Sequence, residues 1–380
     1  MTRRDSNIPC YVKDFAIIIE FTGWTMWNAE EAEDPGFPTD ATSERFFKQL
    51  SSVQTVKISG STRLALSILS PLVTPSLTSL RSLNITSTFH TLSDPFNPSN
   101  YAGLRSCSQL AGLNLSVYHD SQAIPSLPQP PLESISFGSQ LTFAQLMGPL
   151  STSSNADSAR RLVSAFGPLP IFSICDTTQP SSIIPDLLGA LLAPENLRLL
   201  VLGIESRNEI TLIGNLPNQL KAFSSLLALT LLSDFTSLSP NFFSTLHVLP
   251  IEYLKFETTS KVTLSQLFPL IEGPTKHPTL GTIILDHVKG KVGTRIEDAG
   301  KPDYNVETED WDVYYDWTLP DWTQEFSEER LVEFIEVAKK EGVIVRGSAV
   351  DAIGIKAQRR AEWEVLDAYD LDVAEDEAVE

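Results

Sequence analysis

The side chains in this sequence best suited to catalysis or metal binding match no known catalytic or metal-binding motif. No histidine belongs to an H-E-x-x-H motif, and no two histidines are four residues apart. The cysteines include no C-x-x-C pair, so neither a zinc site nor a disulfide framework is expected. We therefore expect no metal, no cofactor and a reducing compartment. The residues concerned are His90, His119, His247, His277, His287, Cys10, Cys107 and Cys175.

Motifs for nucleophilic and phosphate chemistry are also absent. The sequence has no G-x-S-x-G elbow and no G-x-x-x-x-G-K-[S/T] loop. The stretch Lys289–Gly293 contains glycine but lacks the strand-to-helix context of a phosphate loop, and it is interpreted as a solvated turn. Cys175 has no base near it in the sequence and is interpreted as structural. We therefore predict that the chain is not an enzyme. The alternative is an enzyme of unknown reaction on an α/β framework, whose residues converge from separate loops.

Charge is distributed unevenly along the chain. Of the net charge of −20, residues 297–380 hold 25 acids and 8 bases, a net of −17, which leaves −3 for the rest. Neither part is basic enough to favour nucleic acid or an anionic membrane surface as a partner. No run of 18 apolar residues is present, and Met1–Asp5 leads into no apolar signal segment. An intracellular protein, cytoplasmic or nuclear, is the expectation.

An acidic-aromatic segment interrupts the sequence between residues 297 and 326. It contains three of the six tryptophans and three of the eight tyrosines among ten acids. Trp and Tyr are enriched at binding hot spots, so this segment is one candidate partner-binding region. The other interpretation is an ordered loop whose rings cover the end of a repeat array. The candidate residues are Trp311, Tyr314, Tyr315, Trp317 and Trp322.

A short pattern, apolar-x-x-apolar-x-apolar, recurs ten times before this segment. Most of its start-to-start spacings lie near 28 residues, and the extremes are 22 and 41. Near-regular spacing of this kind indicates a repeat architecture. The ten matches are Val12-Phe15-Ile17, Val53-Val56-Ile58, Leu80-Leu83-Ile85, Leu110-Leu113-Leu115, Leu132-Ile135-Phe137, Leu169-Phe172-Ile174, Leu197-Leu200-Leu202, Leu226-Leu229-Leu231, Ile251-Leu254-Phe256 and Leu280-Ile283-Leu285.

Amphipathic helical segments lie between the matches. They are predicted at 63–69, 143–147, 183–192, 241–246 and 264–271. A strand followed by a helix, repeated without a change of direction, implies a parallel sheet in an open α/β solenoid. A doubly wound α/β sheet is the rival, but no glycine-rich turn follows a strand and the strands are half-polar.

The horseshoe expected from this pattern has strands on its concave face and helices on its convex face. In each match, the residue between the last two apolar positions points to the concave face. These residues are mostly small and neutral, without aromatic anchors. They are Ala16, Lys57, Asn84, Asn114, Ser136, Ser173, Val201, Thr230, Lys255 and Ile284. Asn84-Ile85-Thr86 and Asn114-Leu115-Ser116 also fit the N-glycosylation pattern, but their place in strands makes them chance matches.

On these ten matches, residues 10–350 resemble irregular leucine-rich-repeat proteins of the ribonuclease-inhibitor-like type, such as the repeat regions of fungal F-box proteins. The Asn or Cys that regular repeats carry at their ninth position is absent from all ten. Only eleven residues precede the first match, and no F-box is visible there. The role of that family in recruiting ubiquitination targets is therefore not carried over, and a truncated F-box-type receptor that lacks its N-terminal module remains an alternative.

Four regions are predicted: the repeat solenoid of about ten repeats (10–296), the acidic-aromatic insertion (297–326), a C-terminal helical cap with a last strand at 343–345 (327–370) and a disordered acidic tail (371–380). Solenoids commonly bind partners on their concave surface. The predicted function is a monomeric protein-interaction scaffold or adaptor. It would bind a protein partner through the acidic-aromatic segment or through concave residues, of which Lys57, Asn84, Asn114, Thr230 and Lys255 are the candidates.

Overall fold

A computed structural model of the chain contains two compact units, residues 1–227 and 228–380. The structure describes residues 14–18, 52–61, 79–89, 95–119, 137, 141–152, 155–177, 183–204, 210–211, 216–232, 235–237, 240–257, 262–286, 304–305, 310–311, 328–351 and 353.

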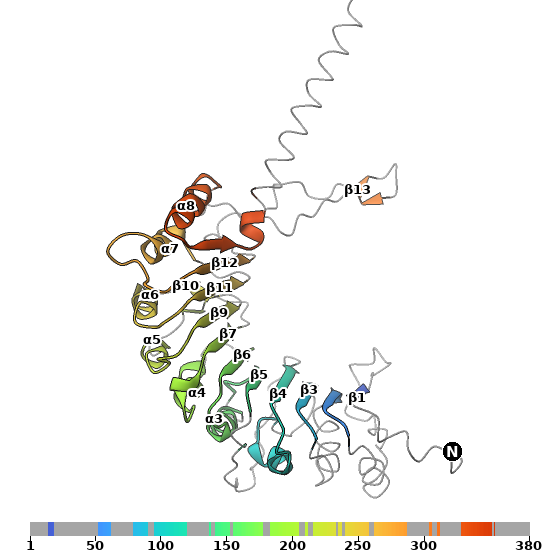
Figure 1. The fold of residues 1–380 in the computed structure, drawn as a ribbon. Helices are drawn as coiled ribbons and strands as arrows, with labels where there is room; N and C mark the ends of the chain where they lie inside the picture. The colour runs from blue at the N-terminus through green and yellow to red at the C-terminus, as the bar shows by residue number, and fades with distance from the viewer. Residues whose placement is uncertain are drawn as a thin grey trace, which may run out of the picture. The chain divides into compact units, whose positions relative to one another are not determined.

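The first unit contains a sheet of parallel strands that follow one another in chain order. Each strand pairs with the strand before it and the strand after it in the sequence, so the chain advances through the sheet in one direction (Figure 1). The strands are β1 (Asp14–Ile18), β2 (Thr55–Ser61), β3 (Ser82–Phe89), β4 (Gly112–His119), β5 (Phe143–Gly148), β6 (Ile171–Asp176) and β7 (Leu199–Ile204).

Short helical segments follow β3, β5, β6 and β7 along the chain. They are η2 (Pro98–Ser106), α3 (Ala156–Ala165), α4 (Ile184–Gly189), η3 (Pro194–Asn196) and α5 (Leu216–Leu220), and the unit also contains the short strand β8 (Ile210–Thr211). Parallel neighbours need such crossovers, because a tight turn can join only antiparallel strands.

The second unit repeats this arrangement. Its parallel strands are β9 (Ala228–Leu232), β11 (Tyr253–Glu257), β12 (Thr282–Asp286) and β15 (Ile344–Arg346), paired in that order. Three helices alternate with them: α6 (Pro240–Leu246), α7 (Leu264–Ile271) and α8 (Glu328–Lys340). The short strands β10 (Phe235–Ser237), β13 (Tyr304–Asn305) and β14 (Asp310–Trp311) complete the unit.

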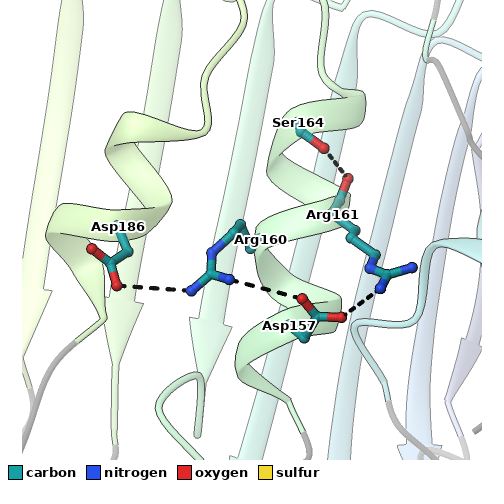
Figure 2. A network of polar contacts seen from close by, with 5 residues as sticks. All are labelled: Asp157, Arg160, Arg161, Ser164 and Asp186. Atoms are coloured by element: carbon teal, nitrogen blue, oxygen red, sulfur yellow. Dashed lines mark hydrogen bonds and ion pairs between the residues drawn. The ribbon is translucent and has the colours of Figure 1, made fainter.

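Burial alternates along the strands and defines the core side of each sheet. In β5 and β6 every second residue is buried, as expected for a strand whose successive side chains point to opposite faces. Leu113, Phe172 and Leu200 of the predicted triplets are fully buried. The helices cover this buried face: α3 buries Leu162 and Val163, and α3 and α4 lie side by side in front of the strands in Figure 2.

The fifth predicted repeat was wrong. Phe143–Met147 was predicted to be helical, but it lies in β5, which pairs with β4 and β6. The apolar positions of this repeat are therefore Leu141, Ala144 and Leu146, all buried. Phe137, which was assigned to a strand, instead packs its ring against Phe166 at 5.5 Å between centroids, on the helical side. The rest of the proposed match, including Ser136, lies outside the described residues.

Other helix predictions are confirmed by the described segments. Helices α4, α6 and α7 lie where the sequence placed them. Helix α7 begins with a capping box, in which the Thr263 hydroxyl accepts from the Gln266 N–H and the Gln266 side chain accepts from the Thr263 N–H. Helix α8 and strand β15 match the predicted C-terminal elements, and Gly342 follows the helix at a φ of 78°. The predicted helix at 63–69 lies outside the described residues.

These observations confirm an α/β protein with parallel strands in sequential order. The doubly wound alternative would place helices on both faces of the sheet. In Figure 1 the helices α3, α4 and α5 lie along one side of the strands of the first unit, and α6 and α7 do the same in the second. The division at residue 296/297 stays a prediction.

Candidate functional site

The face of the first-unit sheet opposite the helices is made of rows of side chains, one residue from each strand. Strand pairing aligns Lys57 of β2 with Asn84 of β3, and Asn84 with Asn114 of β4. The row, here called the central row, continues through Gln145 of β5 to Ser173 of β6. Gln145 thus occupies the position that the sequence assigned to Ser136. Side chains on adjacent strands of such a row lie about 5 Å apart.

The two central asparagines are oriented by hydroxyl groups on their own strands. The Thr86 hydroxyl donates to Asn84 Oδ1 at 3.3 Å, and the Ser116 hydroxyl donates to Asn114 Oδ1 at 3.0 Å. Each pair is two residues apart, so both side chains project from the same face of their strand. Because the amide oxygen accepts the hydroxyl, the NH₂ group is the part of each carboxamide left to donate outward. Both asparagines are partly exposed.

Lys57 adds a positive charge to the same row. Its side chain is exposed, and no described carboxylate forms an ion pair with it. Among the described residues on this face of β2 to β7, none is acidic, and Asp14 of the adjoining strand β1 lies on the same face but aligns with Thr55 rather than with Lys57. The central row over β2 to β5 therefore presents hydrogen-bond donors without an acidic partner.

A second row on this face is apolar over strands β5 to β7. Pairing aligns Phe143 with Ile171, and Ile171 with Leu199, and all three are partly exposed. Val201 of the central row and Met147 lie on the same face. The first-unit face therefore carries its asparagines and lysine over β2 to β4, and over β5 to β7 it adds an apolar row beside Gln145 and Ser173 of the central row. The sequence prediction missed this apolar row because it considered one position per strand.

The corresponding row in the second unit has a different electrostatic character. Thr230 aligns with Lys255, Lys255 with Ile284, and Ile284 with Arg346. Lys255 Nζ lies 2.9 Å from Glu257 Oε2 and 3.1 Å from Asp286 Oδ2. Burial opposes the charge of Lys255, but hydrogen bonds and attraction from the two carboxylates outweigh it and raise the pKa of this lysine.

Asp286 also anchors the backbone that follows β15. Its Oδ1 accepts the Ser348 N–H at 3.1 Å. The approach is close: a Cβ on Gly347, whose φ is 110°, would lie 2.5 Å from the Leu285 carbonyl oxygen. Glycine is needed here both for its conformation and for the space it leaves. Lys255, Glu257 and Asp286 therefore form a self-contained network, and Lys255 is not a free cation for a partner.

Only part of the acidic-aromatic segment is described. Trp311 of β14 pairs with Tyr304 of β13 in a short antiparallel ladder. Tyr314, Tyr315, Trp317 and Trp322 lie outside the described residues.

The side chains of His277 and Cys107 are buried and have structural roles. His277 is buried, Nε2 donates to the Leu246 carbonyl at 2.8 Å, and Nδ1 accepts the Thr279 N–H at 3.3 Å. Burial lowers the pKa of His277, and neighbouring His247, stacked at 5.8 Å, adds to this effect. Cys107 is buried, and burial raises the pKa of its thiol. No cluster of three potential metal ligands occurs among the described residues.

A buried carboxylate in the first unit also has a structural role. Asp176 is fully buried at the end of β6, and its Oδ1 accepts the N–H groups of Leu150 and Ser151 at 3.1 and 3.3 Å. The Ser151 hydroxyl donates to Asp176 Oδ2 and accepts the Ile183 N–H at 3.0 Å. These contacts hold together the chain after β5 and the start of α4. A serine beside an aspartate without a histidine does not make a nucleophilic triad.

The helical side of the first unit carries an exposed ion-pair network (Figure 2). Asp157 pairs with Arg161 at 2.8 Å within α3, and Arg160 lies 3.8 Å from Asp186 of α4. All of these side chains are about half exposed. Exposed pairs of this kind contribute little to stability and neutralise one another, so the helical side presents no unpaired charge at this point.

Comparisons with protein-family models and with curated proteins gave no match. No helix in the described part of the chain has the length and apolar character needed to cross a membrane.

Proposed function

We propose that the chain is a leucine-rich-repeat-type solenoid and that it works as a protein-interaction module. Three observations support the repeat architecture: parallel strands in chain order, helices on one side, and an apolar pattern that coincides with the strands. Repeat solenoids of this kind use the strand face for partners, because it is long and formed by many side chains in register.

The central row carries the functional part of the proposal. Lys57, Asn84, Asn114 and Gln145 lie in register on adjacent strands and present donors that no described acid satisfies. Small apolar or hydroxyl side chains at these positions would stabilise the strands better than asparagine and lysine do. Folding stability alone therefore does not explain why these polar groups are present. They are typical of a surface that is completed by a partner, which we propose to be a protein.

The test makes the same substitution on the strand face and at an exposed position outside the strands. Asn114→Arg places a large side chain on the strand face, and Asn196→Arg places the same side chain on exposed η3. The full chain and both variants would be crosslinked in cell extract and compared by quantitative mass spectrometry. A protein retained by the full chain and by Asn196→Arg, but lost by Asn114→Arg, supports the proposal. Equal capture by all three, or capture of nothing by a folded chain, contradicts it.

A further inference from the structure

The first-unit face has two chemically distinct parts at a fixed separation. Donor groups of Lys57, Asn84 and Asn114 lie over β2 to β4, and the apolar row of Phe143, Ile171 and Leu199 lies over β5 to β7. From β3 to β6 there are three strand spacings, which amounts to about 14 Å.

The donor part favours acceptors that carry negative charge. The Thr86 and Ser116 hydroxyls hold the amide oxygens of Asn84 and Asn114, so their NH₂ groups face a partner that accepts hydrogen bonds. Lys57 adds a full positive charge at the end of this group. A carboxylate fits both kinds of donor, and hydrogen bonds to a charged acceptor are stronger than those between neutral groups.

The apolar part favours a side chain of the leucine or phenylalanine type. Phe143, Ile171 and Leu199 are partly exposed, and in register they form a continuous strip rather than isolated apolar residues. Covering this strip would remove apolar surface from water, which stabilises a complex in proportion to the area covered.

We infer that this face binds a protein segment in which acidic residues lie about 14 Å from an apolar anchor, with the carboxylates over Asn84 and Asn114 and the anchor over Phe143, Ile171 and Leu199. The inference rests on the proposed function, since it specifies the partner of the same face. Lys255 of the second-unit row is not the cation for this contact, because Glu257 and Asp286 already neutralise it.

A set of labelled peptides tests the chemistry and the spacing together. In Glu-Glu-(Pro)n-Leu-Phe, polyproline acts as a ruler, because each residue adds about 3.1 Å. With four prolines the second Glu and the Leu are about 15 Å apart. Binding to the full chain would be measured by fluorescence anisotropy for one, four and ten prolines, and for versions with Lys-Lys or Gln-Gln in place of Glu-Glu. We expect the acidic peptide with four prolines to bind best, and we expect salt to weaken its binding.

The matched variants replace the NH₂ donors of the asparagines by carboxylate oxygens, with almost no change in side-chain size. In the double variant Asn84→Asp and Asn114→Asp, the Thr86 and Ser116 hydroxyls keep an acceptor, so the strands retain these contacts. Losing donors to a charged acceptor and adding like charge should weaken the acidic peptide at least about tenfold. The control Asn196→Asp adds the same charge on exposed η3, outside the strands that form the face, and should leave the affinity unchanged.

Three outcomes would overturn the inference. The first is that the acidic peptides bind no better than the Lys or Gln versions. The second is that the double variant binds the acidic peptide as well as the unmodified chain does. The third is that a single-stranded RNA oligonucleotide, tested in parallel, is the ligand that the double variant loses. If any of these occurs while Asn114→Arg still abolishes protein capture, the ligand class is wrong but the proposed function stands. If capture is also insensitive to Asn114→Arg, the proposed function fails as well.

Discussion

The two faces of β12 offer a direct test of the strand register, because Ile283 and Ile284 are adjacent isoleucines on opposite sides. Ile283 is fully buried and aligns with Leu254 of β11 and Val345 of β15, whereas Ile284 is partly exposed. The same substitution, isoleucine to alanine, can therefore be made one residue apart. Any difference in its effect reports on the side of the sheet rather than on the chemistry of the change.

The expected effects differ severalfold. Ile283→Ala removes three carbon atoms from a fully buried site, which costs about 2.4 kcal/mol in transfer free energy at about 0.8 kcal/mol per methylene. A cavity that closes only partly brings the total to about 3 to 4 kcal/mol. Ile284→Ala leaves no cavity. Its cost comes from the lower strand propensity of alanine, which amounts to about 1 kcal/mol at most.

Urea unfolding of the two variants, followed by circular dichroism, measures these free energies. We expect the midpoint of Ile283→Ala to fall by several times the shift seen for Ile284→Ala, with similar slopes for both variants. Equal shifts, or a larger loss at Ile284, would show that the register of β11, β12 and β15 is wrong and that the rows on the strand face are wrongly assigned.

Three further predictions concern polar side chains with structural roles. His277 has a pKa below the ordinary histidine value of about 6.5, so below that pH the unfolded chain takes up a proton before the folded chain does. Stability should therefore fall as the pH drops from 7 to 5, and His277→Gln should flatten this dependence in pH-resolved urea titrations. Asp176→Ala leaves the Leu150 and Ser151 N–H groups without their buried acceptor, so it should lower the free energy of unfolding in urea by about 3 kcal/mol. If the free energy of unfolding did not change, the structural role of Asp176 would be wrong. Thr263→Ala should cost about 1 kcal/mol through loss of the α7 cap, while Thr263→Ser should restore most of it in thermal melts.

Most of the sheet could be predicted from the sequence because its apolar positions recur at near-constant spacing. The exception, β5, shows the limit of this reasoning. Its second position is Ala144, a small side chain, whereas the competing match ending at Phe137 has three large ones. Spacing was the better guide: a start at Leu141 gives intervals of 31 and 28 residues, and a start at Leu132 gives 22 and 37. A small residue at this position is tolerated because it points into a closely packed core, which the pattern by itself does not reveal.

The orientation of the central asparagines could be anticipated only in part. The recurrence of Asn-x-Ser/Thr at Asn84 and Asn114 was interpreted as chance, although residues two apart on a strand project from the same face and can hydrogen-bond. The structure shows that bond in both strands and places the two strands side by side in register. Whether two such pairs are neighbours depends on strand pairing, and the length of the intervening segment does not determine that.

Lys57 and Lys255 show why a sequence position does not define the charge that a partner meets. Both occupy the same place in the repeat pattern, and both were predicted to contact a partner. Glu257, two residues after Lys255, is visible in the sequence as a neighbour on the same face, but Asp286 approaches only through the pairing of β11 with β12. Lys57 has no acid beside it on β2 or β3, and Asp14 of β1, on the same face, aligns with Thr55 and not with Lys57.

The two lysines should therefore respond differently to the same substitution. Lys57→Met removes from the donor row a charge that no described carboxylate neutralises by an ion pair. It should therefore lower the affinity for the acidic peptide with four prolines several-fold, most clearly at low salt. Lys255→Met removes a charge that Glu257 and Asp286 already neutralise, so it should lower the melting temperature while leaving that affinity unchanged. Anisotropy titrations and thermal melts on both variants separate the two effects. A loss of affinity at Lys255 equal to that at Lys57 would show that the partner contacts the second-unit row and that its ion network opens on binding.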